Sequence, residues 1–382
     1  MDLTAALLRV AARRPHVLVV AVPGSAGARL ALEAALVRRG WPLATGPADA
    51  DVLAVAGAPG PELAAVVERI WRQVPAPRAR IGIRTAGAAD DALDAAAALL
   101  RDAAHQRRPP ATSTAGDDGR DHGGDGDRSD RGGNGHAGGH AGGHDGRHGG
   151  RHGGDGGAHG GDHGDGHGDG HGDGHGGHHG HHGHGDMELP GGLPMADLGE
   201  DRDGLVLDRL HVPLGPVLPD WPAGLVVRVA LQGDVVQEAA AEVLDAGRAA
   251  PSVWPDPVAR ELDALARFLA VAGWAAAAAR ARALRDGETG RAEALVRRVR
   301  RSRTLRWSVR GLPAGSTDVA ALLEERLVGV EAATRGSPSA RRGVEELPGL
   351  LVGAELAAAR LIVAAVDPDT ERAGVPREVR HG

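Results

Sequence analysis

The sequence VLVVAVPGSAGARLALEAALVRRG, residues 17–40, decides the fold of the N-terminal third of the chain. Its first six residues, 17–22, are all apolar, which predicts a short parallel strand that is buried on both faces. Small turn residues follow, and residues 28–39 then predict a helix that Gly40 ends. A strand, a tight turn and a helix in this order form the repeating unit of an open α/β sheet.

The same unit is repeated further along the chain. Strands are predicted at residues 51–56 and 80–83, and helices at residues 61–73 and 89–104. The alternation of strands and helices with short loops predicts a flavodoxin-like α/β domain with a parallel sheet over residues 1–115.

The C-terminal block, residues 187–382, predicts a different architecture. Two apolar runs flank Gln232, Gly233 and Asp234, which indicates a β-hairpin. Helical patterns follow at residues 257–285, 288–301, 318–331 and 344–366. We therefore expect an α+β domain in which a small β element precedes a helical bundle.

Between the two blocks, residues 116–186 consist mainly of glycine, histidine and aspartate and hold 16 of the 20 histidines of the chain. A segment with almost no apolar side chains cannot bury a core, so its composition predicts a disordered linker. Neutral imidazoles are good ligands for Ni²⁺ and Zn²⁺, and metal binding and a plain linker are both compatible with this composition. The candidate metal ligands are the closely spaced histidines His163, His167, His171, His175, His178, His179, His181, His182 and His184.

Several residue types are missing. The chain has no cysteine, no lysine and no tyrosine. Without cysteine it forms neither disulfides nor thiolate-held iron–sulfur or nickel–iron centres. Without lysine it has neither a P-loop nor a Schiff base. The formal charge of −7 favours no nucleic-acid-binding face overall. We interpret the arginines between residues 297 and 306 as a solvated helix face, with a nucleic-acid or lipid patch as the alternative.

No transmembrane segment is predicted. The longest apolar stretch, residues 350–366, contains Glu355 and Arg360, which is typical of a buried amphipathic helix. We expect a cytoplasmic protein, or one that is peripheral at the inner face of the membrane.

Three pieces of the N-terminal block resemble a known family. They are VLVVAVPGSAGARLALE at residues 17–33, ADVLAVAG at residues 50–57 and VPAPRARIGI at residues 74–83. In order and spacing they are similar to the cluster-bearing small subunit of nickel–iron hydrogenases and to the B subunit of complex I. That family has a cluster loop after its first strand, a strand of the type Ala-Asp-x-Leu-x-Val-x-Gly, and a Pro-x-Pro turn.

This chain departs from the family at the cluster ligands. The cysteine pair of the family's loop falls at Ser25 and Ala28, and its later cysteine falls near residues 84–86. Serine and alanine are poor ligands for iron, so the resemblance implies a degenerate loop, with Gly24 and Gly27 beside these positions, and no iron–sulfur cluster.

The C-terminal block resembles the partner of that family. GPVLP at residues 215–219, followed by the hairpin LVVRVALQGDVV at residues 225–236, is similar to the opening of the hydrogenase large subunit and of the complex I D subunit. The family motif reads Gly-Pro-x-His-Pro, and its histidine, which lines the quinone site in complex I, falls at Leu218 here. Both Cys-x-x-Cys pairs of the hydrogenases are absent.

Together the two resemblances imply a fused small-plus-large-subunit protein whose two blocks pack on each other. We expect a non-catalytic scaffold or accessory protein whose partners are subunits of a respiratory or hydrogenase-type complex. No residue is assigned a catalytic role, because no acid–base pair or nucleophile forms a recognisable constellation. Two alternatives stay open: a storage or delivery protein for nickel or zinc, and a subunit of a quinone-linked oxidoreductase that uses a partner's clusters.

Overall fold

A computed structural model describes most of the chain on either side of the His-rich tract. The described residues are 12–107, 197–200, 206–248, 252–254, 256–287, 289–338 and 340–372. Those before the tract (the N-terminal region) and those after it (the C-terminal region) belong to one compact unit. The tract at residues 116–186 lies outside the described residues, so its predicted disorder stays a prediction.

The N-terminal region is built on a parallel sheet of three strands. These strands are β1 (Val17–Ala21), β2 (Val52–Ala56) and β3 (Ala79–Ile83), and they are ordered β1-β2-β3. All five residues of β2 are buried. The predicted strands and the α/β class are therefore confirmed.

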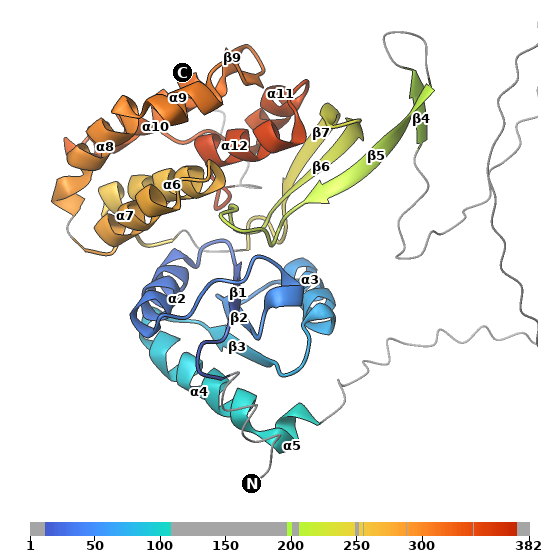
Figure 1. The fold of residues 1–382 in the computed structure, drawn as a ribbon, viewed down its shortest axis with the longest axis vertical. Coiled ribbons are helices and arrows are strands. Elements are labelled where there is room, and N and C mark those ends of the chain that lie inside the picture. The colour runs from blue at the N-terminus through green and yellow to red at the C-terminus, as the bar shows by residue number, and fades with distance from the viewer. Residues whose placement is uncertain are drawn as a thin grey trace, which may run out of the picture. The chain divides into compact units, whose positions relative to one another are not determined.

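Helices cover both faces of this sheet, which explains why its strands are apolar except for Arg80 of β3. Figure 1 shows α2 (Ala26–Arg39) and α4 (Ala89–Arg101) on one side and α3 (Pro61–Gln73) on the other. Leucines of α2 and α4 fill the core on the first side. On the second side the core of α3 also takes in Val217 and Leu244, which belong to the C-terminal region.

The helix predicted at residues 89–104 is in fact two helices. The helix is interrupted at Asp102, which ends α4 and precedes α5 (Ala103–Gln106). The Asp102 carboxylate accepts hydrogen bonds from the backbone N–H groups of Ala104 and His105, so it caps the second helix. An aspartate that satisfies two free N–H groups favours a new helix start over continuation.

The C-terminal region starts with an antiparallel sheet. Its strands, in the order β4-β5-β6-β7, are β4 (Asp197–Glu200), β5 (Val206–Leu214), β6 (Leu225–Gln232) and β7 (Val235–Val243). The predicted hairpin is confirmed, with Gly233 at its turn in the left-handed region, φ 63°. Alternate residues of β6 such as Leu225, Val227 and Val229 are buried in the same core as the helices that follow.

Helices make up the rest of this region, and the α+β class is confirmed. They are α6 (Pro257–Val271), α7 (Ala275–Arg285), α8 (Ala292–Arg301), α9 (Arg303–Val309), α10 (Val319–Thr334), α11 (Leu347–Leu351) and α12 (Leu356–Val366), with the short strands β8 (Pro313–Ala314) and β9 (Thr317–Asp318) between α9 and α10. None of the helices in the described ranges is both long and apolar enough to cross a membrane.

Two of the predicted single helices are interrupted. Residues 257–285 form α6 and α7, and residues 344–366 form α11 and α12 after a short 3₁₀ turn. The breaks contain Gly273 and Gly353, which have φ of 78° and 83°. Glycine adopts this left-handed conformation without steric cost, so it ends one helix and lets the chain turn into the next.

The C-terminal region supplies caps for two helices of the N-terminal region. The Asp245 carboxylate accepts hydrogen bonds from the N–H groups of Glu62 and Leu63 at 3.2 and 3.1 Å, and the Glu62 carboxylate accepts one from the N–H of Asp245 at 2.6 Å. The residue before α3 is Gly60, where an added Cβ would lie 2.3 Å from the Asp245 carboxylate. Likewise the Ser252 hydroxyl accepts from the N–H of Ala26 at the start of α2, at 3.0 Å.

Asp245→Ala should therefore destabilise the whole unit, although Asp245 is far from α3 in the sequence. We expect the free energy of unfolding in urea to fall by about 1–2 kcal/mol, the usual cost of losing an N-cap. Asp91→Ala, at an exposed first-turn position of α4, is the matched control and should cost less than about 1 kcal/mol. Equal effects of the two substitutions would show that Asp245 does not cap α3.

Candidate functional site

Buried charges gather where the two regions meet. Arg29 and Glu33 are one turn apart on α2, Asp263 and Arg267 are one turn apart on α6, and Arg285 is the last residue of α7. Residues four apart lie on the same side of a helix, so each pair projects together. These five side chains form the junction cluster.

Asp263 is at the centre of the junction cluster, and its side chain is only 2% exposed. One carboxylate oxygen accepts from Arg29 at 2.7 Å and also from Arg267. The other oxygen accepts from Arg285 at 2.6 Å. Three guanidinium groups from three helices therefore share one carboxylate.

Glu33 joins the same network from α2. Its two carboxylate oxygens accept from Arg29 at 2.6 Å and from Arg285 at 2.7 Å. Arg285 also donates to Asp286, its neighbour in the sequence, at 2.6 Å. Because Arg29 and Arg285 each contact carboxylates of both regions, the ion pairs cross the junction in both directions.

The network fixes the ionisation of its acids. Burial by itself would raise the pKa of Asp263, but Arg29, Arg267 and Arg285 outweigh burial and hold this pKa well below its usual value. The pKa of Glu33 is lowered for the same reason, since Arg29 and Arg285 outweigh its burial. Neither carboxylate can take up a proton near neutral pH, so the arrangement is suited to holding two regions together and not to general acid–base chemistry.

A cavity of about 270 Å³ adjoins the junction cluster. The apolar lining of this junction cavity includes Leu18 and Val19 of β1 and Leu218 and Trp221 of the loop between β5 and β6. Charged side chains also line it. They are Arg29, Glu33, Asp220, Asp263, Arg267 and Arg282. A lining that contains both apolar and charged side chains is suited to a small amphipathic molecule.

The loop that carries Leu218 is held in a tight conformation. Gly215 has φ 88°, and a Cβ there would lie 2.3 Å from the carbonyl oxygen of Leu225. The Trp221 indole donates to the same carbonyl oxygen at 2.8 Å. Val217 of this loop packs on the core of the parallel sheet, so the motif GPVLP reaches from the C-terminal region to the N-terminal sheet.

Asp220 differs from the acids of the junction cluster. It pairs with Arg282, and its backbone has φ 57°, a conformation that side-chain-bearing residues adopt at a cost. Burial raises the pKa of Asp220, and the attraction of Arg282 only partly opposes this rise. Asp220 is therefore the acid of the junction cavity most easily protonated.

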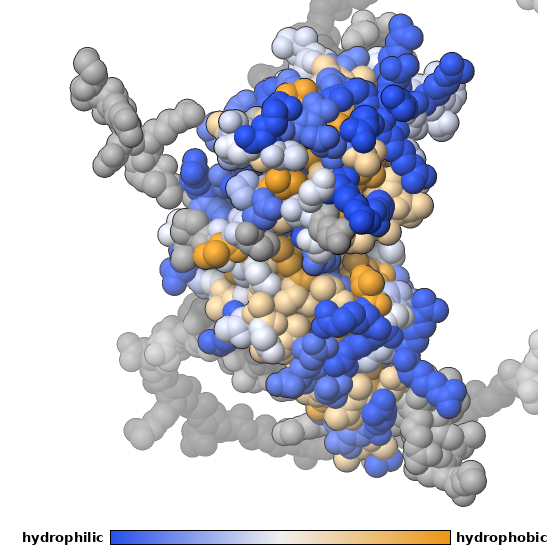
Figure 2. Space-filling model, turned by 90° about the vertical axis from the view of Figure 1, so that its left-hand side faces the viewer, coloured by the Kyte–Doolittle hydropathy of each residue, from blue (hydrophilic) through white to orange (hydrophobic). Residues whose placement is uncertain are grey.

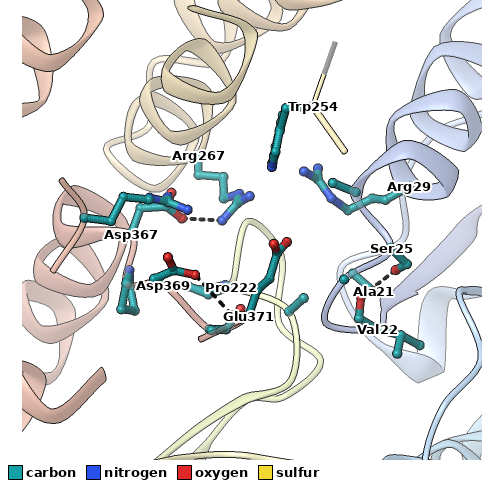
Figure 3. A pocket seen from close by; sticks show the side chains of 16 residues that line it. Ala21, Val22, Ser25, Arg29, Pro222, Trp254, Arg267, Asp367, Asp369 and Glu371 are labelled. Carbon is teal, nitrogen blue, oxygen red and sulfur yellow. Dashed lines mark hydrogen bonds and ion pairs between the residues drawn. The ribbon is translucent and has the colours of Figure 1, made fainter. Parts of the chain in front are cut away.

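A second, smaller pocket lies beside the loop after β1. Figure 3 shows Ser25 and Arg29 on one side of it and Arg267 on the other, where Arg267 pairs with Asp367. Its volume of about 30 Å³ is enough for about one water molecule. Arg29 of the N-terminal region and Arg267, Arg341 and three acids of the C-terminal region line it, so it continues the charged junction.

In the loop after β1 and the start of α2, Ser25 and Ala28 have structural surroundings. The Ser25 hydroxyl lies within hydrogen-bond distance of the carbonyl oxygens of Val22 and Ala56, at 2.5 and 2.6 Å. Ala28 is buried in the core that also contains Ala89, and α2 packs against the 3₁₀ turn Ala86–Ala88. Ser25 is thus held by hydrogen bonds to the backbone, and Ala28 by apolar packing.

The other two positions of that loop have backbone roles. Gly24 has φ 79° and allows the turn after β1, whereas Gly27 lies in the first turn of α2 with open space around it. Neither position presents a ligand group.

The candidate histidines of the tract lie outside the described residues. Among the described residues, no group of three or more histidine and acidic side chains is arranged to hold a metal ion.

The junction cluster is not evident from the amino-acid sequence. Opposite charges four residues apart on α2 and α6 are a detectable signal, but on a surface helix they ordinarily make solvated pairs. Only the burial of Asp263 and Arg285 distinguishes this network from such pairs. Comparisons with protein-family models, with curated proteins and with solved structures found no match.

The lowered pKa values make stability depend on acidity. A carboxyl whose pKa is lower in the folded chain contributes stability above its unfolded pKa of about 4, and loses it as the pH falls through the folded value. We expect the free energy of unfolding to fall steeply below about pH 4. Asp263→Asn should cost about 3–5 kcal/mol at pH 7, because it leaves buried arginines without their shared charge, and should flatten the acid decline.

Urea denaturation across the acid range measures both effects. Asp91→Asn is the control, and its profile should run parallel to that of the wild type. If Asp263→Asn also ran parallel to the wild type, Asp263 would not carry the acid dependence.

Proposed function

We propose that this chain is a non-catalytic scaffold or accessory protein that acts in the cytoplasm beside subunits of a respiratory or hydrogenase-type complex. In this proposal it is a fused and degenerate relative of the small and large subunits of complex I and the nickel–iron hydrogenases. The sequence resemblance suggests this relationship, and the packing of the two regions on each other is consistent with it.

One observation carries the proposal. At the junction of the two regions, where the resemblance would put a redox centre or a quinone, Asp263 is enclosed by Arg29, Arg267 and Arg285. The charge of the Asp263 carboxylate is compensated by ion pairs with arginines of three helices, and these pairs hold the helices together. A site built in this way favours a fixed relative arrangement of the two regions over proton or group transfer.

The junction cavity favours a second candidate, a quinone-linked subunit that uses a partner's clusters. Its apolar wall includes Leu218, at the position of the family's quinone-site histidine. Calorimetric titration with a short-chain ubiquinone tests this candidate. Saturable uptake that Leu218→Trp abolishes by filling the cavity would support the quinone role, and absence of uptake would remove it.

The composition of the His-rich tract favours a third candidate, a storage or delivery protein for nickel or zinc. Imidazoles repeated every few residues, from His163 to His184, provide many exchangeable ligands for these ions. In this candidate the two folded regions would dock the client.

Elemental analysis separates the scaffold from the metal-handling candidate. The measurement uses untagged protein purified anaerobically without affinity resin, as the full chain and as a deletion of residues 116–186. The scaffold proposal expects no stoichiometric iron or sulfide in either protein, and co-migration of both with a larger complex on native gels. Stoichiometric iron and sulfide would overturn it, and stoichiometric nickel or zinc that the deletion loses would favour metal handling.

A further inference from the structure

Two consecutive helices present arginines to solvent. On α8 the buried side chains are Leu295, Val296 and Val299, together with Ala292. The opposite side carries Arg297, Arg298 and Arg301, which are exposed. These three arginines line an open hollow beside Trp274.

The next helix, α9, also carries exposed arginines, and an exposed tryptophan lies among them. Leu305 and Val309 of α9 point into the core. Arg303, Trp307 and Arg310 are spaced i, i+4 and i+7, so they share the outward side, and all three are exposed. Trp307 is 82% exposed, whereas the other five tryptophans are buried or half-buried.

We call these outward side chains the arginine face. It consists of Arg297, Arg298, Arg301, Arg303, Arg306, Trp307 and Arg310. Figure 2 shows strongly hydrophilic side chains over the upper part of the molecule, where the C-terminal helices lie.

The charge of the arginine face is largely uncompensated. Within the described residues, Arg301, Arg303, Arg306 and Arg310 have no carboxylate partner, and Arg297 reaches Glu293 only at 3.5 Å. Arg298 lies over the Trp274 ring, 5.6 Å from its centre. The contrast is Arg300, on the flank of α8, which pairs with Glu324 and Glu331 at 2.7 Å each. Positive charge is thus concentrated on one face of a chain whose formal charge is −7.

An exposed indole among arginines fits one kind of partner best. Tryptophan prefers the headgroup level of a membrane, where its ring is in contact with lipid and its N–H with water. Arginines near an anionic membrane surface bind lipid phosphates and are attracted by the surface potential. A single-stranded nucleic acid would need several stacking aromatics, and Trp307 is the one exposed aromatic side chain among the described residues.

We propose that the arginine face binds an anionic lipid surface peripherally. Trp307 lies at the level of the headgroups, and Arg303 and Arg310 on either side of it contact lipid phosphates. Leu305 and Val309 stay in the protein core, so binding needs no unfolding of α9.

Vesicle co-sedimentation of the full chain tests the proposal. The vesicles are phosphatidylcholine alone or phosphatidylcholine mixed with phosphatidylserine. We expect binding only to the mixed vesicles, with loss at high salt, because surface attraction is screened. The variant Arg303→Gln/Arg306→Gln/Arg310→Gln should weaken binding about fivefold for each arginine removed. Trp307→Ala should weaken binding and abolish the vesicle-induced blue shift of tryptophan fluorescence.

A matched variant controls for net charge. Arg69→Gln/Arg84→Gln/Arg101→Gln removes three exposed arginines of the N-terminal region and should bind like the wild type. All substituted side chains are exposed, so urea midpoints should stay close to that of the wild type. Equal binding to neutral and mixed vesicles, equal losses in the two triple variants, or binding to single-stranded DNA but not to vesicles would overturn the proposal.

Discussion

The burial of Asp263 at the junction is the constraint on which the rest of the structure depends. A carboxylate removed from water is stable only if its charge is compensated nearby, and here α2, α6 and α7 each contribute an arginine to it. Any rearrangement that separates these helices would leave several buried charges without partners. The ion pairs therefore couple the parallel sheet of one region to the helices of the other, and the junction cavity and the small pocket take their shape from this coupling.

Shared caps strengthen the same junction. Asp245 and Ser252 accept hydrogen bonds from N–H groups at the starts of α3 and α2, so the C-terminal region caps these two helices of the N-terminal region. Val217 and Leu244 extend one core of the parallel sheet in the same way. Because both polar and apolar contacts cross the junction, the two regions are expected to unfold together.

Apart from histidine, arginine supplies all the positive side-chain charge of this chain. It has opposite roles at two places. At the junction its planar, always charged guanidinium shares carboxylates with neighbours and is taken out of water. On α8 and α9 the same group stays solvated and largely unpaired beside an exposed indole. The role of an arginine here therefore depends on its burial and on the number of acids near it. Buried arginines with acidic partners hold the two regions together, and exposed arginines without partners are available to an external anion.

The sequence by itself determined the element types, because apolar runs with turn residues between them specify buried strands and amphipathic helices. The three parallel strands, the hairpin at Gly233 and most helices were predicted in this way. The breaks at Asp102 and Gly273 were missed, because capping and left-handed glycine depend on the local backbone. Only the tertiary structure revealed the junction cluster. Arg29 and Asp263 are distant in sequence, and each of them alone is typical of a solvated surface charge. Their pairing follows from how the two regions pack, and that packing is a property of the whole chain.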